Sequence, residues 1–326
     1  MKAIQIAAAG GPEVLQLVSL PDPVPGEREV VVRACAIGVG KPDVLFRTGV
    51  YRWMPPLPAT PGAEMAGTIE ALGLGVTQLH VGQKVLVYRF AGGGYAERIA
   101  VKADEVTPLP DAVDLDDAVS IPNFQVASAL LNEAAFGVKP RTVYVNGAAG
   151  GIGAAVIQLC RLAGITVIAG ASTAEKCAFA QAQGAHATVN YGLDNVVVRV
   201  REITDGRGVD LVLDHIVGKD FTDNLKMLAP FGLIVSFNAL GGLPEKELFK
   251  EMRANLPLSP AVRCFTMHSF DHYPDAKRHI AARVIALFAA GQVKPPVHAR
   301  LPLSEVRRAH EMLDRREALG KILLKP

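Results

Sequence analysis

The chain has 326 residues, a length that suits about two domains, so two separate hydrophobic cores are expected. Half of the residues are hydrophobic, a fifth are charged, and the formal net charge is only +2. This composition excludes an intrinsically disordered chain and does not indicate a nucleic-acid-binding surface, so we expect a small, roughly neutral partner.

The sequence carries no segment typical of secretion or of a membrane span. The opening stretch "MKAIQIAAAGGPEVL" has one lysine but no long apolar block. No uncharged apolar run of helical composition reaches the length of about 18 residues that a membrane helix needs. The four cysteines stand far apart without a C-x-x-C pair, which fits neither a disulfide framework nor a cysteine-rich zinc lobe. A cytoplasmic protein is expected.

The order of predicted elements indicates an α/β protein with an interrupted first domain. Residues 1–122 contain short strand-like runs, such as "EVVVRACAIGV", separated by turn signals, and predict a mainly β unit. In residues 123–261 strand-like and helix-like runs alternate, which predicts βαβ units around a parallel sheet. Residues 262–326 return to a β-plus-helix pattern and end in the strand-like "GKILLKP", so we expect this tail to complete the first domain.

A cluster of small residues lies between a strand-like and a helix-like run in "VYVNGAAGGIGAAVIQL" (143–159). It fits a dinucleotide fingerprint, Ala148-x-Gly150-x-x-Gly153, with alanine in the first glycine position. Small residues at a sharp strand-to-helix turn let a pyrophosphate approach the first N–H groups of the helix. The alternative is a tight packing contact that binds nothing, but the strand before, the helix after and the further βα units favour nucleotide binding.

The end of the next strand indicates which dinucleotide binds. An acidic residue about 20 positions after the glycines would accept hydrogen bonds from a free ribose 2′-hydroxyl and repel a 2′-phosphate. Here "ASTAEK" places Ala171 and Ser172 at that position and Lys176 within one turn, so a hydroxyl and a cation can face a phosphate. We therefore predict NADP(H), although Glu175 beside the lysine weakens the electrostatic argument and a solvated surface lysine is the alternative.

These motifs occur in an order that resembles the zinc-independent quinone oxidoreductases, the zeta-crystallin-like branch of the medium-chain dehydrogenase/reductase superfamily, over essentially the full length of the chain. The matching stretches are "KPDVLFRTGVY" (41–51), "PATPGAEMAGTI" (58–69), "GGYAE" (93–97), "NGAAGGIG" (146–153), "ASTAEK" (171–176), "GAHATVNY" (184–191) and "GKILLKP" (320–326).

The resemblance implies a GroES-like β domain built from both chain ends (1–122 and 262–326) and an inserted Rossmann domain (123–261). It implies that NADPH meets a quinone or another electron-poor carbonyl compound in a cleft, and that the protein is a homodimer joined through edge strands of the Rossmann sheets. The implied cofactor contacts are Gly150, Gly151 and Ile152 at the pyrophosphate, and Ser172, Lys176 and Tyr191 at the 2′-phosphate. For Tyr191 the alternative is an aromatic residue that packs at the end of a strand.

The positions that hold catalytic zinc in the zinc-dependent relatives lack metal ligands here. The cysteine position is Gly40, and the histidine of the G-H-E stretch is Ala63, so neither side chain can coordinate a cation. Cys35 lies five residues too early. The polar run "HSFDHYPDAKRH" (268–279) is interrupted by Pro274 and is expected to form a loop that enters a helix. We expect no metal.

Without a Lewis acid, an already electrophilic quinone or enone is the expected substrate. Tyr51 is the predicted donor to a developing oxyanion, with a packed loop aromatic as the alternative. Asp43 and Arg47 match the family pattern at this edge of the cleft, and Asp43 is a second candidate catalytic residue. An internal ion pair that fixes the loop is at least as good an interpretation as direct chemistry.

Two substrate-site positions depart from the family. Relatives usually carry Asn where this chain has Gly40 and Thr where it has Gln125. The loss of the Asn removes a side-chain amide and widens the substrate site, which leaves specificity for quinones open. Gln125 or Asn238 could supply the missing polar group. Asn238 is also assigned to the cofactor site, with a turn cap as its alternative.

Two rival functions stay open. An alkenal or enoyl double-bond reductase shares this fold and cofactor. A crystallin-like or RNA-binding role without catalysis ranks lower, because the net charge is near zero and no basic stripe is present. A hydrolase is not supported, since no G-x-S-x-G motif occurs.

Overall fold

The structure is a computed structural model that describes residues 1–52 and 54–326. The chain divides into two compact units. Unit 1 comprises Met1–Pro122 together with Ile285–Pro326, and unit 2 comprises Asn123–Val284. The chain crosses from one unit to the other inside helix α3 (Ile121–Asn132) and returns inside helix α8 (Pro274–Ala289).

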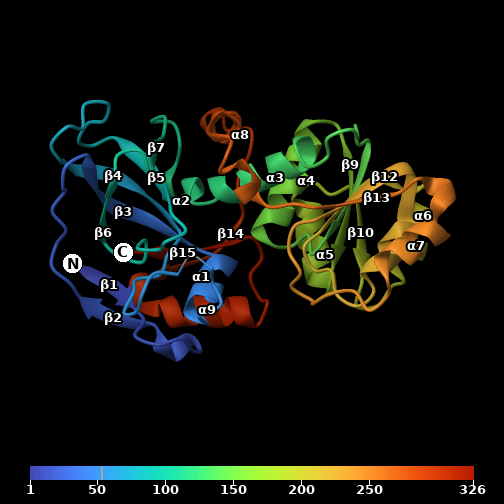
Figure 1. Cartoon of the computed structure of the whole chain (residues 1–326), viewed down its shortest axis with the longest axis horizontal. Coiled ribbons are helices and arrows are strands. Elements are labelled where there is room, and N and C mark those ends of the chain that lie inside the picture. Colours follow the sequence, from blue (N-terminus) through green and yellow to red (C-terminus); the bar gives the residue numbers. More distant parts are fainter. Residues whose placement is uncertain (53) are drawn as a thin grey trace. The chain divides into compact units, whose positions relative to one another are not determined.

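Unit 1 is a β domain that uses both ends of the chain, as the colours of Figure 1 show for β3 and β15. Its main sheet has the order β14-β15-β3-β4-β5-β7, and β6 also pairs with β3. The C-terminal strand β15 pairs antiparallel with β3, where Leu323 lies opposite Gly38. The strands of this sheet are β3 (Glu29–Val39), β4 (Glu64–Leu72), β5 (Lys84–Tyr88), β6 (Arg98–Lys102), β7 (Val106–Pro108), β14 (Val297–Pro302) and β15 (Lys321–Lys325).

A hairpin-like pair and short helices complete unit 1: β1 (Lys2–Gln5), β2 (Gln16–Ser19), α1 (Lys41–Arg47), α2 (Leu115–Ala118) and α9 (Val306–Asp314). Valine and isoleucine dominate β3, and Val30, Val32 and Ile37 are fully buried in a core shared with β4, β5 and the C-terminal elements. β-branched residues suit a pleated surface that is buried in this way.

Buried polar contacts attach α9 to this core. The Tyr95 hydroxyl and His310 Nε2 are 3.1 Å apart, and both residues are inaccessible to solvent. Burial, with the nearby charge of Arg47, lowers the pKa of His310 to about 3. His310 therefore stays neutral in the core. Arg47 itself donates to Asp314 at 2.9 Å.

Unit 2 is a parallel sheet with the strand order β10-β9-β8-β11-β12-β13 and helices packed around it (Figure 1). Numbered along the chain, this is the order 3-2-1-4-5-6 of a Rossmann fold, and all the pairs are parallel. The strands are β8 (Thr142–Asn146), β9 (Thr166–Ala171), β10 (Ala187–Asn190), β11 (Val209–Asp214), β12 (Leu228–Ser236) and β13 (Ala261–Cys264). The remaining helices are α4 (Gly151–Leu162), α5 (Ala174–Ala182), α6 (Val196–Ile203) and α7 (Leu248–Ala254).

The predicted fold class, a GroES-like β domain plus a Rossmann domain, is confirmed. The second expected domain boundary differs from the division seen in the structure. Residues 261 and 262 both lie within β13, which pairs with β12 and so belongs to the Rossmann sheet. Unit 2 continues to Val284, and Arg283 of α8 donates to Ser128 of α3 at 2.9 Å and to Glu133 at 3.0 Å within the same unit.

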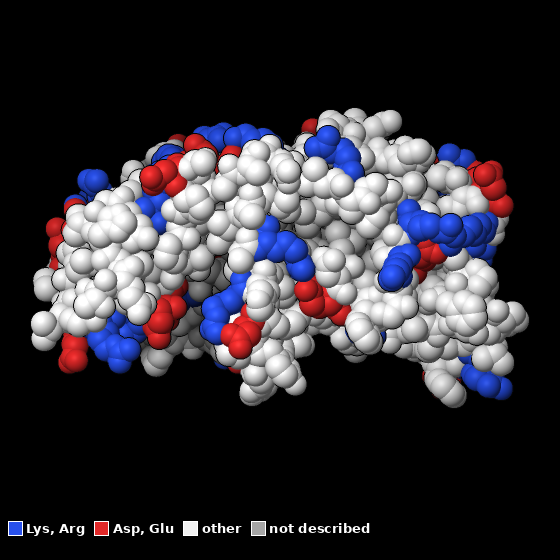
Figure 2. Space-filling model, turned by 90° about the horizontal axis from the view of Figure 1, so that it is seen from above, with Lys and Arg blue, Asp and Glu red and all other residues white. Residues whose placement is uncertain are grey.

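Charged side chains are mixed on the face of the molecule drawn in Figure 2, where acidic and basic groups are interspersed among uncharged ones. This distribution does not resemble the continuous basic stripe typical of nucleic-acid-binding proteins. Among the described residues, no helix combines the length and the apolar character required to cross a membrane.

Candidate functional site

The glycine loop after β8 leaves the N-terminus of α4 open. Gly147 adopts φ +70°, which a residue with a side chain rarely adopts. Gly150 caps α4 without a side-chain hydrogen bond, and a Cβ placed on it would meet nothing nearer than the Gly147 oxygen at 4.0 Å. The N–H groups of the first helical turn have no acceptor within the helix. Gly150, Gly151 and Ile152 therefore form a cradle that fits a pyrophosphate.

The third glycine of the motif has a packing role. A Cβ on Gly153 would lie 2.4 Å from the Ala148 oxygen, so only glycine lets α4 approach the loop this closely. Ala148 N also donates to Gly170 O at 2.9 Å and ties the loop to β9. The first glycine position is occupied by Ala148, whose small side chain is fully buried in the structure.

The structure brings together the residues predicted to face a 2′-phosphate. Lys176 Nζ lies 3.3 Å from Ser172 Oγ, and both side chains are half-buried after the carboxyl end of β9. Thr173 caps α5 by accepting the N–H of Lys176, which fixes the helical turn that carries the lysine. Tyr191 follows the adjacent strand β10, donates its N–H to Ala171 O at 3.0 Å, and keeps 37% of its surface exposed. This arrangement fits the phosphorylated cofactor.

Asn238 takes part in the turn that follows β12. Its side-chain oxygen accepts the N–H of Ala239 at 2.9 Å, and its backbone oxygen lies 3.3 Å from Ser236 Oγ. These contacts fit the alternative interpretation given above, in which Asn238 stabilises a turn. Gln125 lies half-buried on α3 within unit 2, whereas Gly40, Asp43 and Tyr51 belong to unit 1.

Asp43 organises the start of α1. Its two carboxylate oxygens accept the N–H of Gly40 at 2.8 Å and the N–H of Ala63 at 3.0 Å. Burial raises the pKa of Asp43 to about 6, Glu64 adds to the rise, and the two N–H groups and Lys321 oppose it. The carboxylate thus holds together the backbone at Gly40 and at Ala63, the two positions compared above with zinc ligands.

A buried ion pair lies next to this carboxylate. The ammonium of Lys321, on β15, donates to Glu64 at the start of β4, and the two side chains are 5% and 9% exposed. A Cβ on Gly40 would lie 3.9 Å from both Lys321 Nζ and Asp43 Oδ2. Gly40, which stands at the expected position of a zinc-binding cysteine, therefore lies next to a fixed ammonium. Sequence reasoning did not find Lys321, which stands in the quoted "GKILLKP" stretch but 257 residues from its partner.

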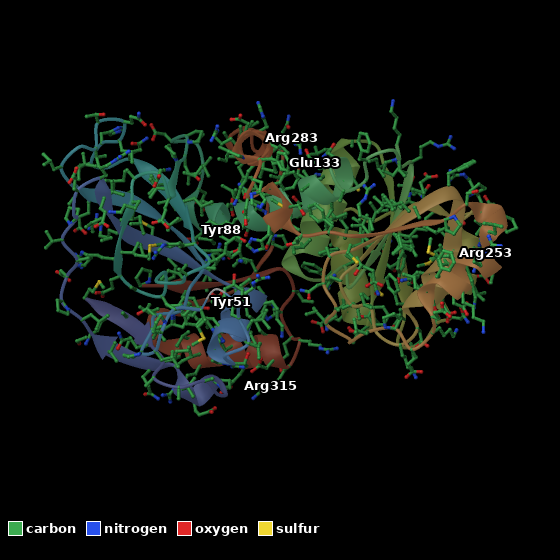
Figure 3. All side chains as sticks on the ribbon, in the orientation of Figure 1. Tyr51, Tyr88, Glu133, Arg253, Arg283 and Arg315 are labelled. Carbon is green, nitrogen blue, oxygen red and sulfur yellow. The ribbon has the colours of Figure 1, made fainter. Side chains whose placement is uncertain are left out.

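Tyr51 follows α1 and Tyr88 ends β5, and both are labelled in Figure 3. Both phenols feel the charge of Asp43. Burial and then the charge of Asp43 raise the pKa of Tyr51. Burial, followed by Glu64, raises the pKa of Tyr88. Both phenols therefore stay protonated at neutral pH and can act as hydrogen-bond donors.

Arg47 and the polar run at 268–279 are the remaining residues singled out in the sequence. Arg47 makes an internal ion pair, and its partner is Asp314 of α9. In the polar run that leads into α8, Asp271 contacts His268 Nδ1 at 2.8 Å and, within the helix, Lys277 Nζ at 3.2 Å, which suits a solvated loop that enters a helix. Within residues 1–52 and 54–326, no three His, Cys, Asp or Glu side chains are grouped as metal ligands.

Asp214, at the carboxyl end of β11, is a buried residue that sequence reasoning missed. One of its oxygens accepts Asn146 Nδ2 at 3.0 Å, Ile216 N at 2.8 Å and Val217 N at 3.0 Å, and the other accepts Asn224 Nδ2 at 2.9 Å. These bonds join the end of β8 to the turn after β11. An acidic residue directly after the apolar run "LVL" (211–213) was the available signal.

Comparisons with known proteins agree with this arrangement. The alcohol dehydrogenase GroES-like domain model matches residues 26–111, and the zinc-binding dehydrogenase model matches residues 183–324. Quinone oxidoreductase of Pseudomonas aeruginosa is 33% identical over 329 residues, which cover 100% of this chain and 99% of the relative. The Escherichia coli quinone oxidoreductase complexed with NADPH has a TM-score of 0.89 at 30% identity, and a mycobacterial quinone oxidoreductase has 0.86 at 32%. Both matches cover 100% of each chain.

A GroES-like β domain joined to a Rossmann domain with an open glycine loop defines a medium-chain dehydrogenase/reductase. Within that superfamily, the chain belongs to the quinone oxidoreductase family. The resemblance predicted from the sequence motifs and the prediction of an oxidoreductase are thereby confirmed.

The raised pKa of Asp43 predicts a pH-dependent stability. Because the folded-state pKa of about 6 exceeds the value of 3.8 for an exposed carboxyl, the folded protein holds an extra proton between these pH values, and Asp43 makes it less stable as pH rises. Asp43→Asn cannot ionise. The free energy of unfolding of the wild type relative to this variant should therefore fall by about 1–3 kcal/mol between pH 4 and pH 7.

Urea titrations of both proteins across this range measure the difference. Asp111→Asn, at an exposed position of the same unit, is the control. A wild-type-to-variant difference that is constant over the range would contradict the raised pKa. Glu64, Lys321 and Tyr51 adjoin Asp43 and are unchanged in both proteins.

Proposed function

We propose that the protein is an NADPH-dependent oxidoreductase that reduces a quinone or a similar activated carbonyl or enone compound without a metal. The observation that carries the proposal is the contact between Lys176 and Ser172 beside the glycine loop. A cation and a hydroxyl at this position attract a 2′-phosphate. The full-length similarity to quinone oxidoreductases, one of them complexed with NADPH, supports the same function.

The chain's own residues would bind and orient the cofactor. Gly150, Gly151 and Ile152 would hold the pyrophosphate by their N–H groups, and Ser172, Lys176 and Tyr191 would hold the 2′-phosphate. NADPH, when bound, supplies the hydride. The remaining task of the protein is to position the substrate and stabilise the charge that forms on its oxygen. Tyr51, whose phenol stays protonated, is the proposed donor.

Metal independence is proposed from the residues at the zinc positions. Gly40 and Ala63 have no side-chain donor atom for a metal, and their N–H groups are both bound by Asp43. The ammonium of Lys321, buried beside Glu64 and Gly40, would repel a divalent cation. A quinone needs no Lewis acid because it is already an electrophile.

A double-bond reductase acting on alkenals or enoyl compounds is the second candidate. The observation that favours it is Gly40, because the absence of a side chain there leaves room beside Asp43 and Lys321 that an amide fills in relatives. A binding role without catalysis ranks below both enzymes, since acidic and basic groups are interspersed on the face shown in Figure 2.

The protein is also proposed to form a homodimer through β13. This strand is the outer edge of the unit 2 sheet, and Phe265 N donates inward to Ser236 O at 2.8 Å. Because N–H groups alternate in direction along a strand, the N–H of Cys264 points away from β12. Exposed apolar side chains of the same unit, Leu243, Phe249 and Leu256, add surface that a partner copy would cover.

NADPH turnover with a panel of quinones, alkenals and enoyl thioesters tests the reaction. We expect turnover with quinones that is unaffected by a metal chelator. The Gly40→Asn variant, whose Cβ meets only ordinary contacts of 3.5 Å or more, should raise the ratio of quinone to alkenal kcat/KM. Turnover with alkenals or thioesters alone would favour the second candidate. Lack of turnover with every compound, or loss on chelation with recovery by zinc, would contradict the proposal.

Lys176→Ala tests the cofactor. Losing a charged contact to the 2′-phosphate should raise the Kd for NADPH about tenfold and leave that for NADH within about twofold. Isothermal titration of both cofactors measures the change. Glu175→Gln, an exposed neighbour on α5, is the matched control and should leave the preference for NADPH in place. Equal losses for NADPH and NADH would remove the argument for NADPH.

Cys264→Pro tests the dimer. Proline removes the outward N–H of the edge strand, so the dissociation constant of the dimer should rise at least about tenfold. Sedimentation velocity measures this change. Cys264→Ala keeps the N–H and should remain dimeric. A wild-type protein that sediments as a monomer, or a dimer indifferent to Cys264→Pro, would contradict pairing through β13.

A further inference from the structure

His215 occupies the point where the strand order of the Rossmann sheet reverses. It directly follows β11, the neighbour of β8 on the side away from β9. In a sheet of this order, the crevice between the first and fourth strands is where a dinucleotide crosses from one half of the fold to the other. A side chain at the carboxyl end of β11 is therefore placed beside the path of the ligand.

The imidazole of His215 lies against the glycine loop itself. A Cβ built on Gly147 would come within 2.5 Å of His215 Cε1 and 2.8 Å of Nε2, so the ring occupies the space next to the first residue after β8. On its other side the ring packs against Phe237, with centroids 5.4 Å apart and planes at 44°. Among the described residues, neither imidazole nitrogen has a hydrogen-bond partner, and the side chain is half-buried.

The backbone beneath the ring is held rigidly. Val217 adopts φ +59°, a strained conformation for a β-branched residue, and its N–H is bound by Asp214. Gly241 N donates to Ile216 O at 2.7 Å and Leu240 N donates to His215 O at 3.1 Å. The loop after β12 thus supports the loop that carries the imidazole, and a group fixed in this way is preorganised for binding.

The ring is a neutral donor. Burial lowers the pKa of His215, and the negative charge of Asp214 only partly opposes the shift. A neutral imidazole carries one N–H donor and one acceptor nitrogen, which suits a ribose hydroxyl or an amide better than a phosphate.

We propose that His215 is a cofactor-contacting residue that hydrogen-bonds the nicotinamide-riboside half of NADP(H) at the reversal of strand order. The assignment to this half follows from the topology. The glycine loop, Ser172, Lys176 and Tyr191 follow β8, β9 and β10, which form one mononucleotide-binding half, whereas His215 follows β11, the first strand of the other half. This inference rests on the proposed use of NADPH.

Binding of NADPH and of its fragment 2′,5′-ADP, which lacks the nicotinamide riboside, tests the proposal. In His215→Ala we expect the Kd for NADPH to rise about 3- to 10-fold, the loss of one neutral hydrogen bond, with the Kd for 2′,5′-ADP unchanged. Lys176→Ala should weaken both ligands. His215→Asn and His215→Gln each place a hydrogen-bonding amide where the imidazole was. At least one of them should recover half or more of the affinity for NADPH that His215→Ala loses, on a logarithmic scale.

His186→Ala is the matched control, because His186 is an exposed histidine at the amino end of β10 in the same unit. It should change neither affinity. Equal weakening of NADPH and 2′,5′-ADP by His215→Ala would mean that the ring acts only by packing on Gly147, and would overturn the proposal. Unchanged affinity for both ligands, or no recovery with either amide, would overturn it as well. A wild-type protein that binds neither 2′,5′-ADP nor NADPH would instead refute the proposed cofactor, and the inference with it.

Discussion

The buried carboxylate of Asp214 is the interaction on which the candidate cofactor site depends. It is inaccessible to solvent and accepts four hydrogen bonds, one of them from Asn146 immediately before the glycine loop. A buried charge is tolerated only when such donors satisfy it. The strained Val217 is retained because its N–H is one of them. The ends of β8 and β11 are thereby fixed together, which holds the glycine loop and the His215 turn in register.

A second buried cluster organises unit 1 in a similar manner. Asp43 binds the backbone at Gly40 and Ala63, while Lys321 from the last strand neutralises Glu64. Removing one partner of such a cluster would leave an uncompensated buried charge, which is strongly destabilising. The C-terminal strand therefore contributes both a sheet partner for β3 and the cation beside the zinc positions of related enzymes. The region around Gly40 and Glu64 is thus built around a fixed ammonium.

Several features could be predicted because they depend on local sequence. The turn at Gly147 to Gly153 requires small residues, and the helix after it begins where the pattern places it. Ser172 directly precedes the N-cap of α5 and Lys176 lies in the first turn of that helix, so their contact depends on only four residues of local chain. The domain boundary near residue 262 was harder to place, because β13 is a short strand whose membership in the Rossmann sheet depends on pairing with β12.

The sequence by itself determined the class of fold and the family, since these depend on short motifs in which a few neighbouring residues meet a steric or electrostatic requirement. Only the tertiary structure decided which distant residues share a site. Lys321 and Glu64 are 257 positions apart, and Asp214 lies 68 positions from Asn146. His215 meets Gly147 only because β11 pairs with β8. Such contacts are set by strand order and packing, which bring residues together irrespective of their distance along the chain.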